Sequence, residues 1–452
     1  MMMRLSDVAH MTHGQLVGLD VAFDAVSTDS RNIRPGDLFI ALRGERFDGH
    51  DYAVDCMGRG AVAAVVSGLV EGVASQVLVG DTRIALGELA AGWRNRFSIP
   101  LAAVTGSNGK TTVKEMLAAI LRAAAGEDDA VLATQGNLNN DIGLPMTLLK
   151  LHAGHRYAVA EMGMNHAGEI GYLTAIARPT VALVNNALPA HLEGLGSVEG
   201  VARAKGEIFS GLAADGVAII NADDAFAPLW QQLAMPHRVV TFGLEQAAEV
   251  SAEYQLRHDA TDLKLKTPQG EIVVTLPAAG LHNVRNALAA TAAALAMGVL
   301  PDAVQAGLQG FSGAKGRLQR KTGQQGCVVI DDTYNANPAS MRAAIDVLAA
   351  CPGQRILVLG DMGELGADAL QMHQAVGRYA ADAGLQGLLT LGEMSRAYGG
   401  QVFETPEALV AALQPQLNAQ TTVLVKGSRF MRMERVVALL SNTDNKENRH
   451  AA

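Results

Sequence analysis

The sequence predicts an α/β protein made of three domains. The chain has 452 residues, more than one hydrophobic core ordinarily serves. Apolar residues make up 49% of the chain and aromatic residues only 4%, which suits helices packed on parallel sheets better than an all-β sandwich. Short apolar runs alternate with helix-like stretches and glycine-rich turns, as strand–helix repeats do.

Residues 1–83 are expected to form a small N-terminal α/β domain. Apolar runs at 37–42, 61–66 and 76–79 alternate there with Gly, Asp and Arg. A helical stretch over 84–97 then leads into the second domain.

The second predicted domain, residues 84–312, contains a strand, a glycine-rich loop and a helix in direct succession at 99–120. Glycines in such a loop let backbone N–H groups converge on phosphate oxygens, and the start of the helix adds positive potential. A lysine then reaches the terminal phosphates and a threonine hydroxyl binds Mg²⁺. We therefore expect a P-loop ATPase-like domain with a parallel sheet, in which ATP contacts Gly106, Ser107, Asn108, Gly109, Lys110, Thr111 and Thr112.

Two later apolar runs, 157–162 and 181–185, are typical of parallel strands covered on both faces. Functional residues belong at the carboxyl ends of such strands. Glu161 lies at one of these ends and can share a cation with Thr111, because a hard cation on phosphates needs oxygen ligands. A helix cap or a surface acid is the simpler alternative for this glutamate.

His191 and Lys205 are weaker candidates on the residues alone. His191 follows a strand by a few residues and is either a second metal ligand or a surface histidine. Lys205 lies in the helix-like stretch 197–212, where a lysine is usually a solvated charge.

The third predicted domain, residues 313–452, begins at a glycine-rich junction. Its apolar runs repeat the strand–helix pattern, at 327–332, 355–360, 388–392 and 422–427. We expect a Rossmann-like domain that lacks the dinucleotide glycine fingerprint. Residues from about 441 onward have no apolar periodicity and are expected to be a disordered tail.

Polar residues cluster after the first strand of this third domain. Asp331 and Asp332 end the strand and are followed by turn-forming residues, a combination suited to recognising hydroxyl and amine groups. Asn337 before Pro338 is also typical of a helix N-cap. Arg317, at the domain junction, either directs its guanidinium toward a triphosphate or is a plain hinge residue.

The charge and the cysteine content of the chain limit the classes of partner and the cellular compartment that we expect. The net charge of −9, with no cluster of Lys and Arg among aromatic residues, argues against a nucleic-acid surface. The three cysteines are scattered, which fits a reducing compartment. The N-terminus has no apolar stretch of signal-peptide length, and the sequence contains no window of about 18 uncharged apolar residues that could cross a membrane. We expect a monomeric cytoplasmic protein that does not insert into membranes.

Together, the motifs resemble those of the Mur ligases, ATP-dependent amide-forming enzymes of peptidoglycan precursor synthesis. The segments that carry the resemblance are, in chain order, 29–31, 105–112, 161–163, His191 with Lys205, 282–286, Arg317 and Asp332. Segments 137–145, 332–338 and 359–366 are most similar to the branch of the family that adds D-alanyl-D-alanine to UDP-N-acetylmuramoyl-tripeptide. The stretch from Gly106 to Gly109 is shorter than in the common phosphate-loop pattern, and the family's loop has the same shortened length.

The resemblance implies a role for each domain. The first would hold the uridine nucleotide end of the precursor through Ser27, Thr28, Asp29, Ser30 and Arg31. The second would bind ATP and two Mg²⁺ ions, with Thr111 and Glu161 at one ion and His191 and a carbamylated Lys205 at the other. Asn283 and Asn286 would lie along the adenosine. The third would bring Arg317 and Asp332 to ATP, and Asn335 and Asn337 to D-alanyl-D-alanine.

In this family ATP first phosphorylates the tripeptide carboxylate, and the dipeptide amine then attacks the acyl phosphate. Closure of the third domain about 313–316 would keep water from that intermediate. Three alternatives stay open: another Mur-type or folylpolyglutamate-type amide ligase, a regulatory P-loop ATPase, and a binding module without catalysis. The third domain discriminates among the ligases, since the segment 332–338 is mostly neutral and polar.

Overall fold

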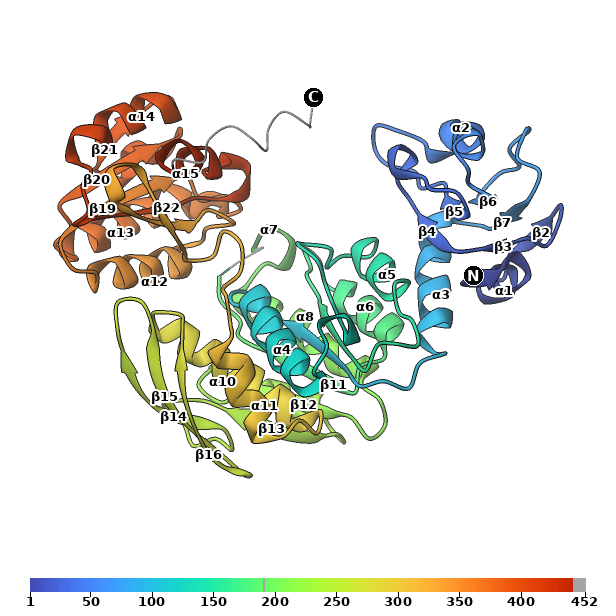
Figure 1. Ribbon diagram of the computed structural model, residues 1–452, viewed down its shortest axis with the longest axis horizontal. Helices are drawn as coiled ribbons and strands as arrows, with labels where there is room; N and C mark the ends of the chain where they lie inside the picture. The colour runs from blue at the N-terminus through green and yellow to red at the C-terminus, as the bar shows by residue number, and fades with distance from the viewer. Residues whose placement is uncertain (190–191, 442–452) are drawn as a thin grey trace.

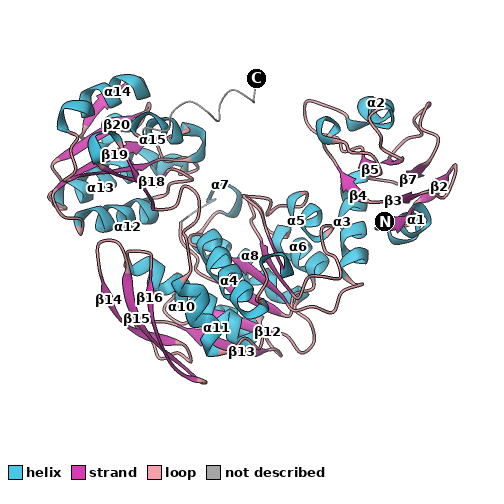
Figure 2. Cartoon of the chain, in the orientation of Figure 1, coloured by secondary structure: helices cyan, strands magenta, loops and turns pink. Residues whose placement is uncertain are grey.

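The computed structural model describes residues 1–189 and 192–441, and the tail expected from about 441 lies almost wholly outside them. Three lobes follow one another along the chain (Figure 1). Each contains a mainly parallel sheet with helices against its faces (Figure 2). The predicted α/β class is therefore confirmed. Within the described ranges, no helix is both long and apolar enough to cross a membrane.

The N-terminal lobe contains a five-stranded sheet in the order β2-β7-β6-β5-β4. Only β2 pairs in the antiparallel sense. The strands are β2 (Gln15–Val17), β4 (Ala25–Ser27), β5 (Asp37–Ile40), β6 (Ala63–Val66) and β7 (Gln76–Leu78). Two short strands, β1 (Met3–Arg4) and β3 (Ala22–Phe23), pair beside helix α1 (Leu5–Met11), and α2 (Ala53–Gly58) follows β5.

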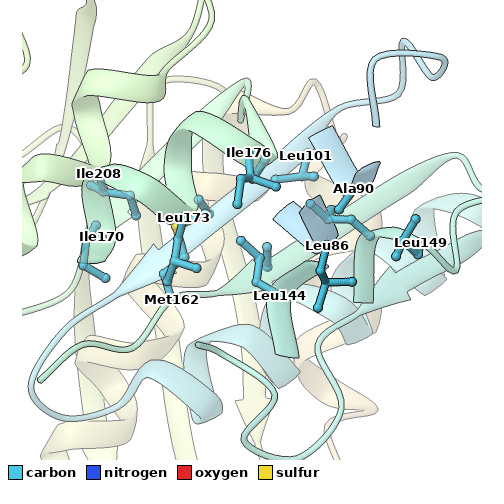
Figure 3. Packing of buried hydrophobic residues seen from close by; sticks show 14 of the residues in the cluster. Leu86, Ala90, Leu101, Leu144, Leu149, Met162, Ile170, Leu173, Ile176 and Ile208 are labelled. Carbon is cyan, nitrogen blue, oxygen red and sulfur yellow. The ribbon is translucent and has the colours of Figure 1, made fainter. Parts of the chain in front are cut away.

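Helix α3 (Thr82–Arg94) joins this lobe to the central one. The Asp81 side chain caps it by accepting from the backbone N–H groups of Arg83 and Ile84. Leu86 and Ala90 on the helix pack among apolar side chains of the central lobe (Figure 3). The connection is therefore a buried helix whose apolar face belongs to a core shared by both lobes.

The central sheet has six parallel strands in the order β13-β12-β11-β8-β10-β9. The strands are β8 (Leu101–Thr105), β9 (Val131–Ala133), β10 (Tyr157–Glu161), β11 (Val181–Val184), β12 (Val217–Asn221) and β13 (Arg238–Phe242). The three runs predicted as strands are β8, β10 and β11, which are neighbours. Their carboxyl ends therefore meet at one edge of the sheet, as expected of parallel strands.

Helices cover both faces of the central sheet. Three of them pack in one apolar cluster on one face: α4 (Lys110–Ala125), α10 (Leu281–Ala296) and α11 (Pro301–Gln309). The opposite face packs against α3 and against α5 (Gly143–Leu148), α6 (Glu169–Ala177), α8 (Val198–Gly206) and α9 (Ala227–Leu233). The short α7 (Leu192–Leu195) precedes α8.

An antiparallel three-stranded sheet is attached to the central lobe, formed by β14 (Ser251–Leu256), β15 (Thr261–Thr267) and β16 (Gly270–Leu276). Leu263 and Leu265 on β15 are buried in the cluster that contains α10, while Lys264 and Lys266, which alternate with them, pair with acids of the neighbouring strands. This alternation is the period of a half-buried strand.

The C-terminal lobe contains a six-stranded sheet in the order β17-β18-β22-β19-β20-β21, parallel except for β17. The strands are β17 (Gln319–Thr322), β18 (Val328–Asp332), β19 (Gln354–Gly360), β20 (Gly387–Leu391), β21 (Gln401–Phe403) and β22 (Thr421–Lys426). Helices α12 (Pro338–Ala349) and α13 (Ala369–Asp382) pack in one cluster, and α14 (Pro406–Leu413) and α15 (Glu434–Leu440) in another. The strand order is doubly wound, because β22 lies between β18 and β19.

Candidate functional site

A cavity of about 1010 Å³ lies where the central and C-terminal lobes face each other. Its walls come from the carboxyl ends of strands in both sheets, which is where ligands bind in open α/β sheets. Most of the residues predicted for ATP, metal and dipeptide line it: Ser107, Asn108, Gly109, Lys110, Thr112, Glu161, Lys205, Asn283, Asn286, Arg317, Asp332, Asn335 and Asn337. Gly106 and Thr111 belong to the same loop as the first five.

Hydrogen bonds from the backbone of the phosphate loop to Asn186, which follows β11, fix the conformation of the loop. The Ser107 N–H donates to the Asn186 carbonyl at 3.0 Å, and the Asn108 N–H donates to the Asn186 Oδ1 at 2.9 Å. Gly109 has a φ of +81°, which the backbone needs to turn into α4. Because α4 begins at Lys110, its first N–H groups have no partner within the helix and are available to phosphate oxygens.

Lys110 folds back over this loop. Its Nζ donates to the Gly106 carbonyl at 2.6 Å. Burial lowers the pKa of Lys110, with the neighbouring Glu161 acting in the opposite direction and Arg317 in the same one. An anionic phosphate group on the loop would relieve this cost, because it adds a negative charge to that of Glu161 beside the half-buried ammonium.

Glu161 ends β10, beside the strand that carries the loop. It is 2% exposed. Its Oε2 accepts from the Thr111 hydroxyl at 2.8 Å, and its Oε1 accepts from the Asn139 amide at 2.7 Å. The structure therefore brings together the two oxygen donors predicted to share a cation.

Asn139 is a residue to which the sequence analysis gave no role. It belongs to the segment 137–145, and its amide fixes one carboxylate oxygen of Glu161. The neighbouring Asn140 accepts from the Gly143 N–H at the start of α5. A run of asparagines after a strand was the available signal, but only the fold shows which of them reaches the glutamate.

Lys205 is 2% exposed, although its position on α8 suggested a solvated charge. It has no hydrogen bond or ion pair with any described residue, and it lines the cavity. Burial lowers its pKa well below that of a free lysine, and the charge of Lys110 acts in the same direction. His191, its predicted companion, lies outside the described residues.

Asn283 and Asn286 lie at the start of α10, against the phosphate loop. The Asn185 amide donates to the Asn108 carbonyl at 2.9 Å and to the Asn286 Oδ1 at 3.2 Å. The Asn286 amide donates in turn to the Asn283 Oδ1 at 3.3 Å. These amides tie the end of β11 and the start of α10 to the loop.

Arg317 crosses from the C-terminal lobe to the central one. Its Nη2 donates to the Thr111 hydroxyl at 2.9 Å, and its guanidinium carbon lies 4.3 Å from the centre of the Tyr334 ring. The Nε atom is buried without a partner among the described residues. A stacked guanidinium is held in a defined orientation, with donors directed at the phosphate loop.

Asp332 and Asp331 are both engaged inside the protein. The Lys426 Nζ lies 2.6 Å from the Asp332 Oδ2, in a pair whose side chains are 4% and 11% exposed. Asp331 accepts from the Thr333 hydroxyl at 2.6 Å and pairs with Lys321 at 2.8 Å. A carboxylate at a buried strand end needs such partners, so neither acid faces the cavity as an unpaired charge.

Asn337 has two roles in the structure. It is the N-cap of α12, accepting from the Ser340 N–H at 2.9 Å, which confirms that prediction. Its amide also donates to the Asn108 side chain across the cavity at 2.7 Å. Asn335, two residues earlier, accepts from the Ala336 N–H, and its carbonyl accepts from Lys426.

Ser27, Thr28, Asp29, Ser30 and Arg31 lie in the N-terminal lobe, at the end of β4. None of these five described residues lines the cavity. The Asp29 carboxylate pairs with Arg31 at 2.9 Å, which lowers the pKa of Asp29 to about 2. The predicted uridine-binding segment and the predicted ATP site therefore belong to different lobes, the N-terminal and the central one (Figure 1).

Three family models match successive parts of this chain. The Mur ligase family catalytic domain matches residues 22–94, the Mur ligase middle domain residues 104–294, and the Mur ligase glutamate ligase domain residues 316–429. The chain belongs to the Mur ligase family. In this Mur ligase, each of the three lobes is matched by one of these family models.

Relatives of this Mur ligase are similar over nearly their whole length. The UDP-N-acetylmuramoyl-tripeptide–D-alanyl-D-alanine ligase of Escherichia coli is 45% identical, covering 96% of this chain and 98% of the relative. The crystal structure of MurF from Acinetobacter baumannii has 40% identity and a TM-score of 0.90, covering 96% and 97% of the two chains. The MurF ligase of Thermotoga maritima, solved in complex with ADP, has 27% identity and a TM-score of 0.82, covering 92% and 96%.

Proposed function

We propose that this protein joins D-alanyl-D-alanine to UDP-N-acetylmuramoyl-tripeptide in an ATP-dependent, ADP-forming reaction. The observation that carries the proposal is the cavity between two lobes, where a phosphate loop faces the strand ends of a separate Rossmann-like domain. Full-length similarity to ligases named for this reaction supports the choice of substrates. The product is the pentapeptide precursor of peptidoglycan.

The central lobe supplies the phosphate chemistry. The loop 106–112 receives the ATP phosphates on its backbone N–H groups and on Lys110. A carboxylate is a poor acyl donor because attack on it would expel oxide, and transfer of the terminal phosphoryl group to the tripeptide carboxylate installs a leaving group. Lys110 and Arg317 offset the charge that develops between the two anions.

Mg²⁺ fits the donors present. The Thr111 hydroxyl and the Glu161 carboxylate are 2.8 Å apart and are the hard oxygen ligands that this ion prefers. Bound there, Mg²⁺ would neutralise charge on the phosphates. We assign Thr111 and Glu161 to one ion, and His191 with Lys205 to a second.

We further propose that Lys205 is carbamylated. Its burial favours the neutral amine, whose lone pair can attack CO₂; the new N–C bond forms as the amine loses a proton, leaving an anionic carbamate. This converts a buried amine without a partner in the described structure into an oxygen ligand. A carbamate at Lys205 would replace the repulsion between Lys205 and the half-buried Lys110 by attraction.

The C-terminal lobe presents the incoming amine. Asn283 and Asn286, on α10 of the central lobe, lie along the adenosine. From the C-terminal lobe, Arg317 reaches ATP and Asp332 acts beside it through its pair with Lys426. Asn335 and Asn337 line the side of the cavity that receives the dipeptide. Keeping water from the acyl phosphate then depends on the contact between the two lobes, which Asn337 and Asn108 already make.

The N-terminal lobe binds the uridine nucleotide end of the precursor through Ser27, Thr28, Asp29, Ser30 and Arg31. The two ends of the UDP-linked peptide would then bind to different lobes, the uridine end to the N-terminal lobe and the carboxylate end beside the phosphate loop. We propose the domain division 1–83, 84–312 and 313–452, and a monomer that acts in the cytoplasm without nucleic acid.

Phosphate release from ATP tests the proposed reaction. With Mg²⁺, UDP-N-acetylmuramoyl-tripeptide and D-alanyl-D-alanine together, we expect release and a product heavier by one dipeptide; omission of either substrate should abolish product. Release indifferent to both substrates would identify a regulatory ATPase. Dependence on a different amino component would identify another amide ligase of this superfamily.

A further inference from the structure

The C-terminal wall of the cavity contains an arginine and a phenylalanine to which no role has been given. Arg429 and Phe430 follow β22, and both line the cavity. Phe430 is 63% exposed, although it is a large apolar side chain. We propose that Arg429 binds the carboxylate of the incoming dipeptide and that Phe430 contacts its methyl groups.

The loop that holds them is joined to two others. The Gly363 N–H, after β19, donates to the Ser428 hydroxyl at 2.8 Å, and that hydroxyl donates to the Ala336 carbonyl, after β18, at 3.2 Å. Three strand ends therefore meet at Ser428. This is the point where the strand order reverses, the usual position of a ligand crevice in such sheets.

Phe430 packs over a glycine at this junction. A Cβ added at Gly363 would lie 3.0 Å from the Phe430 Cε1. The ring therefore rests on bare backbone on one side and is open on the other. An exposed ring on the wall of a cavity suits small apolar groups such as the two alanine methyls.

The charges on this wall favour Arg429 as the carboxylate partner. Among its described residues, Lys426 is committed to Asp332 at 2.6 Å, and Arg317 donates to Thr111 and stacks on Tyr334. Within the described ranges, the ion pair of Arg429 is an exposed one with Glu434 at 3.3 Å. A guanidinium with donors to spare binds a carboxylate through two parallel hydrogen bonds.

The reaction requires the dipeptide to bind with its amine and its carboxylate at opposite sides of the cavity. Its amine must point at the acyl phosphate near Lys110 and Arg317, so its carboxylate must lie toward the far side of the cavity. A carboxylate taken from water needs a cation there. The inference rests on the proposed function, because it takes D-alanyl-D-alanine as the amino substrate.

The test compares D-alanyl-D-alanine with its C-terminal amide, which has the same amine and no negative charge. The wild-type enzyme should favour the acid in kcat/KM by roughly ten- to hundredfold, the range of a charge-assisted hydrogen bond. In Arg429→Gln the ratio of the two kcat/KM values should fall close to one, while KM for ATP stays unchanged. Arg429→Lys should retain part of the preference, which keeps the test decisive if the glutamine variant folds poorly.

Two variants serve as controls. Glu434→Gln removes the ion-pair partner that Arg429 has among the described residues, and Arg378→Gln removes an exposed arginine of α13 that does not line the cavity. Both should keep the wild-type ratio. An undiminished ratio in Arg429→Gln, a wild type indifferent to the carboxylate, or a change confined to KM for ATP would overturn the inference. A wild type that makes no product from D-alanyl-D-alanine would instead refute the proposed function itself.

Discussion

Replacement of Gly109 by alanine tests whether the phosphate loop is held in place by the asparagines behind it. Gly109 precedes α4 with a φ of +81°, and Gly126 follows the same helix with a φ of +75°. A Cβ at Gly109 would lie 2.5 Å from the Asn185 Nδ2 and well inside contact distance of the Asn286 Oδ1. A Cβ at Gly126 would meet nothing within 4 Å. The two substitutions therefore share their backbone strain and differ in steric conflict.

The expected free energies follow from these surroundings. A left-handed alanine costs about 1–2 kcal/mol, which is the whole expected effect of Gly126→Ala. Gly109→Ala must also push apart the Asn185–Asn286 hydrogen bond, worth about 0.5–1.5 kcal/mol, and leave buried amide groups unpaired at about 1–3 kcal/mol. We expect Gly109→Ala to lower the free energy of unfolding by roughly 3–6 kcal/mol.

Urea unfolding of the two variants and the wild type measures the difference, and titration with ATP measures the consequence for binding. Gly109→Ala should weaken ATP binding, because the displaced loop no longer presents its N–H groups together, whereas Gly126→Ala should bind ATP as the wild type does. Equal losses of stability in the two variants, or unchanged ATP binding by Gly109→Ala, would show that the asparagines do not position the loop.

Three further variants test single groups. Lys110→Ala should reduce the rate of phosphoryl transfer by roughly 10²-fold or more with normal folding; near-normal single-turnover rates would remove Lys110 from the site. Lys205→Ala should lose activity and partly regain it with added short carboxylic acids, and a fully active variant would contradict carbamylation. Burial, followed by the charges of Lys426 and Arg285, lowers the pKa of His282 from 6.5 to about 4. Between pH 6.5 and 4, His282 is therefore protonated in the unfolded chain but neutral in the folded one. The free energy of unfolding falls as the pH drops through this range. His282→Gln should remove at most about 3 kcal/mol of that fall, measured by urea unfolding at each pH, and an unchanged pH dependence would refute this assignment.

The parts of the fold predicted from sequence are those that short stretches determine. A buried strand, a glycine-rich turn and a helix start are contiguous at 99–120, so their pattern is local and the structure confirms it. The antiparallel sheet at 251–276 was missed, although β15 and β16 alternate buried and exposed residues with a period of two. That signal was present in the sequence; what it could not supply was the helix face that covers the sheet.

The site divides in the same way. Glu161 follows from its place at a strand end, since parallel strands bring their carboxyl ends together. The burial of Lys205 does not follow from its spacing, because it depends on how α8 packs against the rest of the central lobe. Asn139 reaches Glu161 from 22 residues away, and Arg317 reaches Thr111 from 206. Contacts of that separation are set by the fold, and no local pattern encodes them.

Arg317 connects the two halves of the site through a single hydroxyl. The Thr111 oxygen donates to Glu161 and accepts from Arg317, so it is already shared by a carboxylate and a guanidinium. If that oxygen also serves as an Mg²⁺ ligand, two cations would face each other across one atom, which is unfavourable unless an anion lies between them. ATP phosphate is that anion. Arg317 is therefore expected to leave Thr111 for the phosphate when ATP binds, while its stacking on Tyr334 keeps it within reach. Because Arg317 belongs to the C-terminal lobe, this change of partner would make the position of that lobe depend on the bound nucleotide.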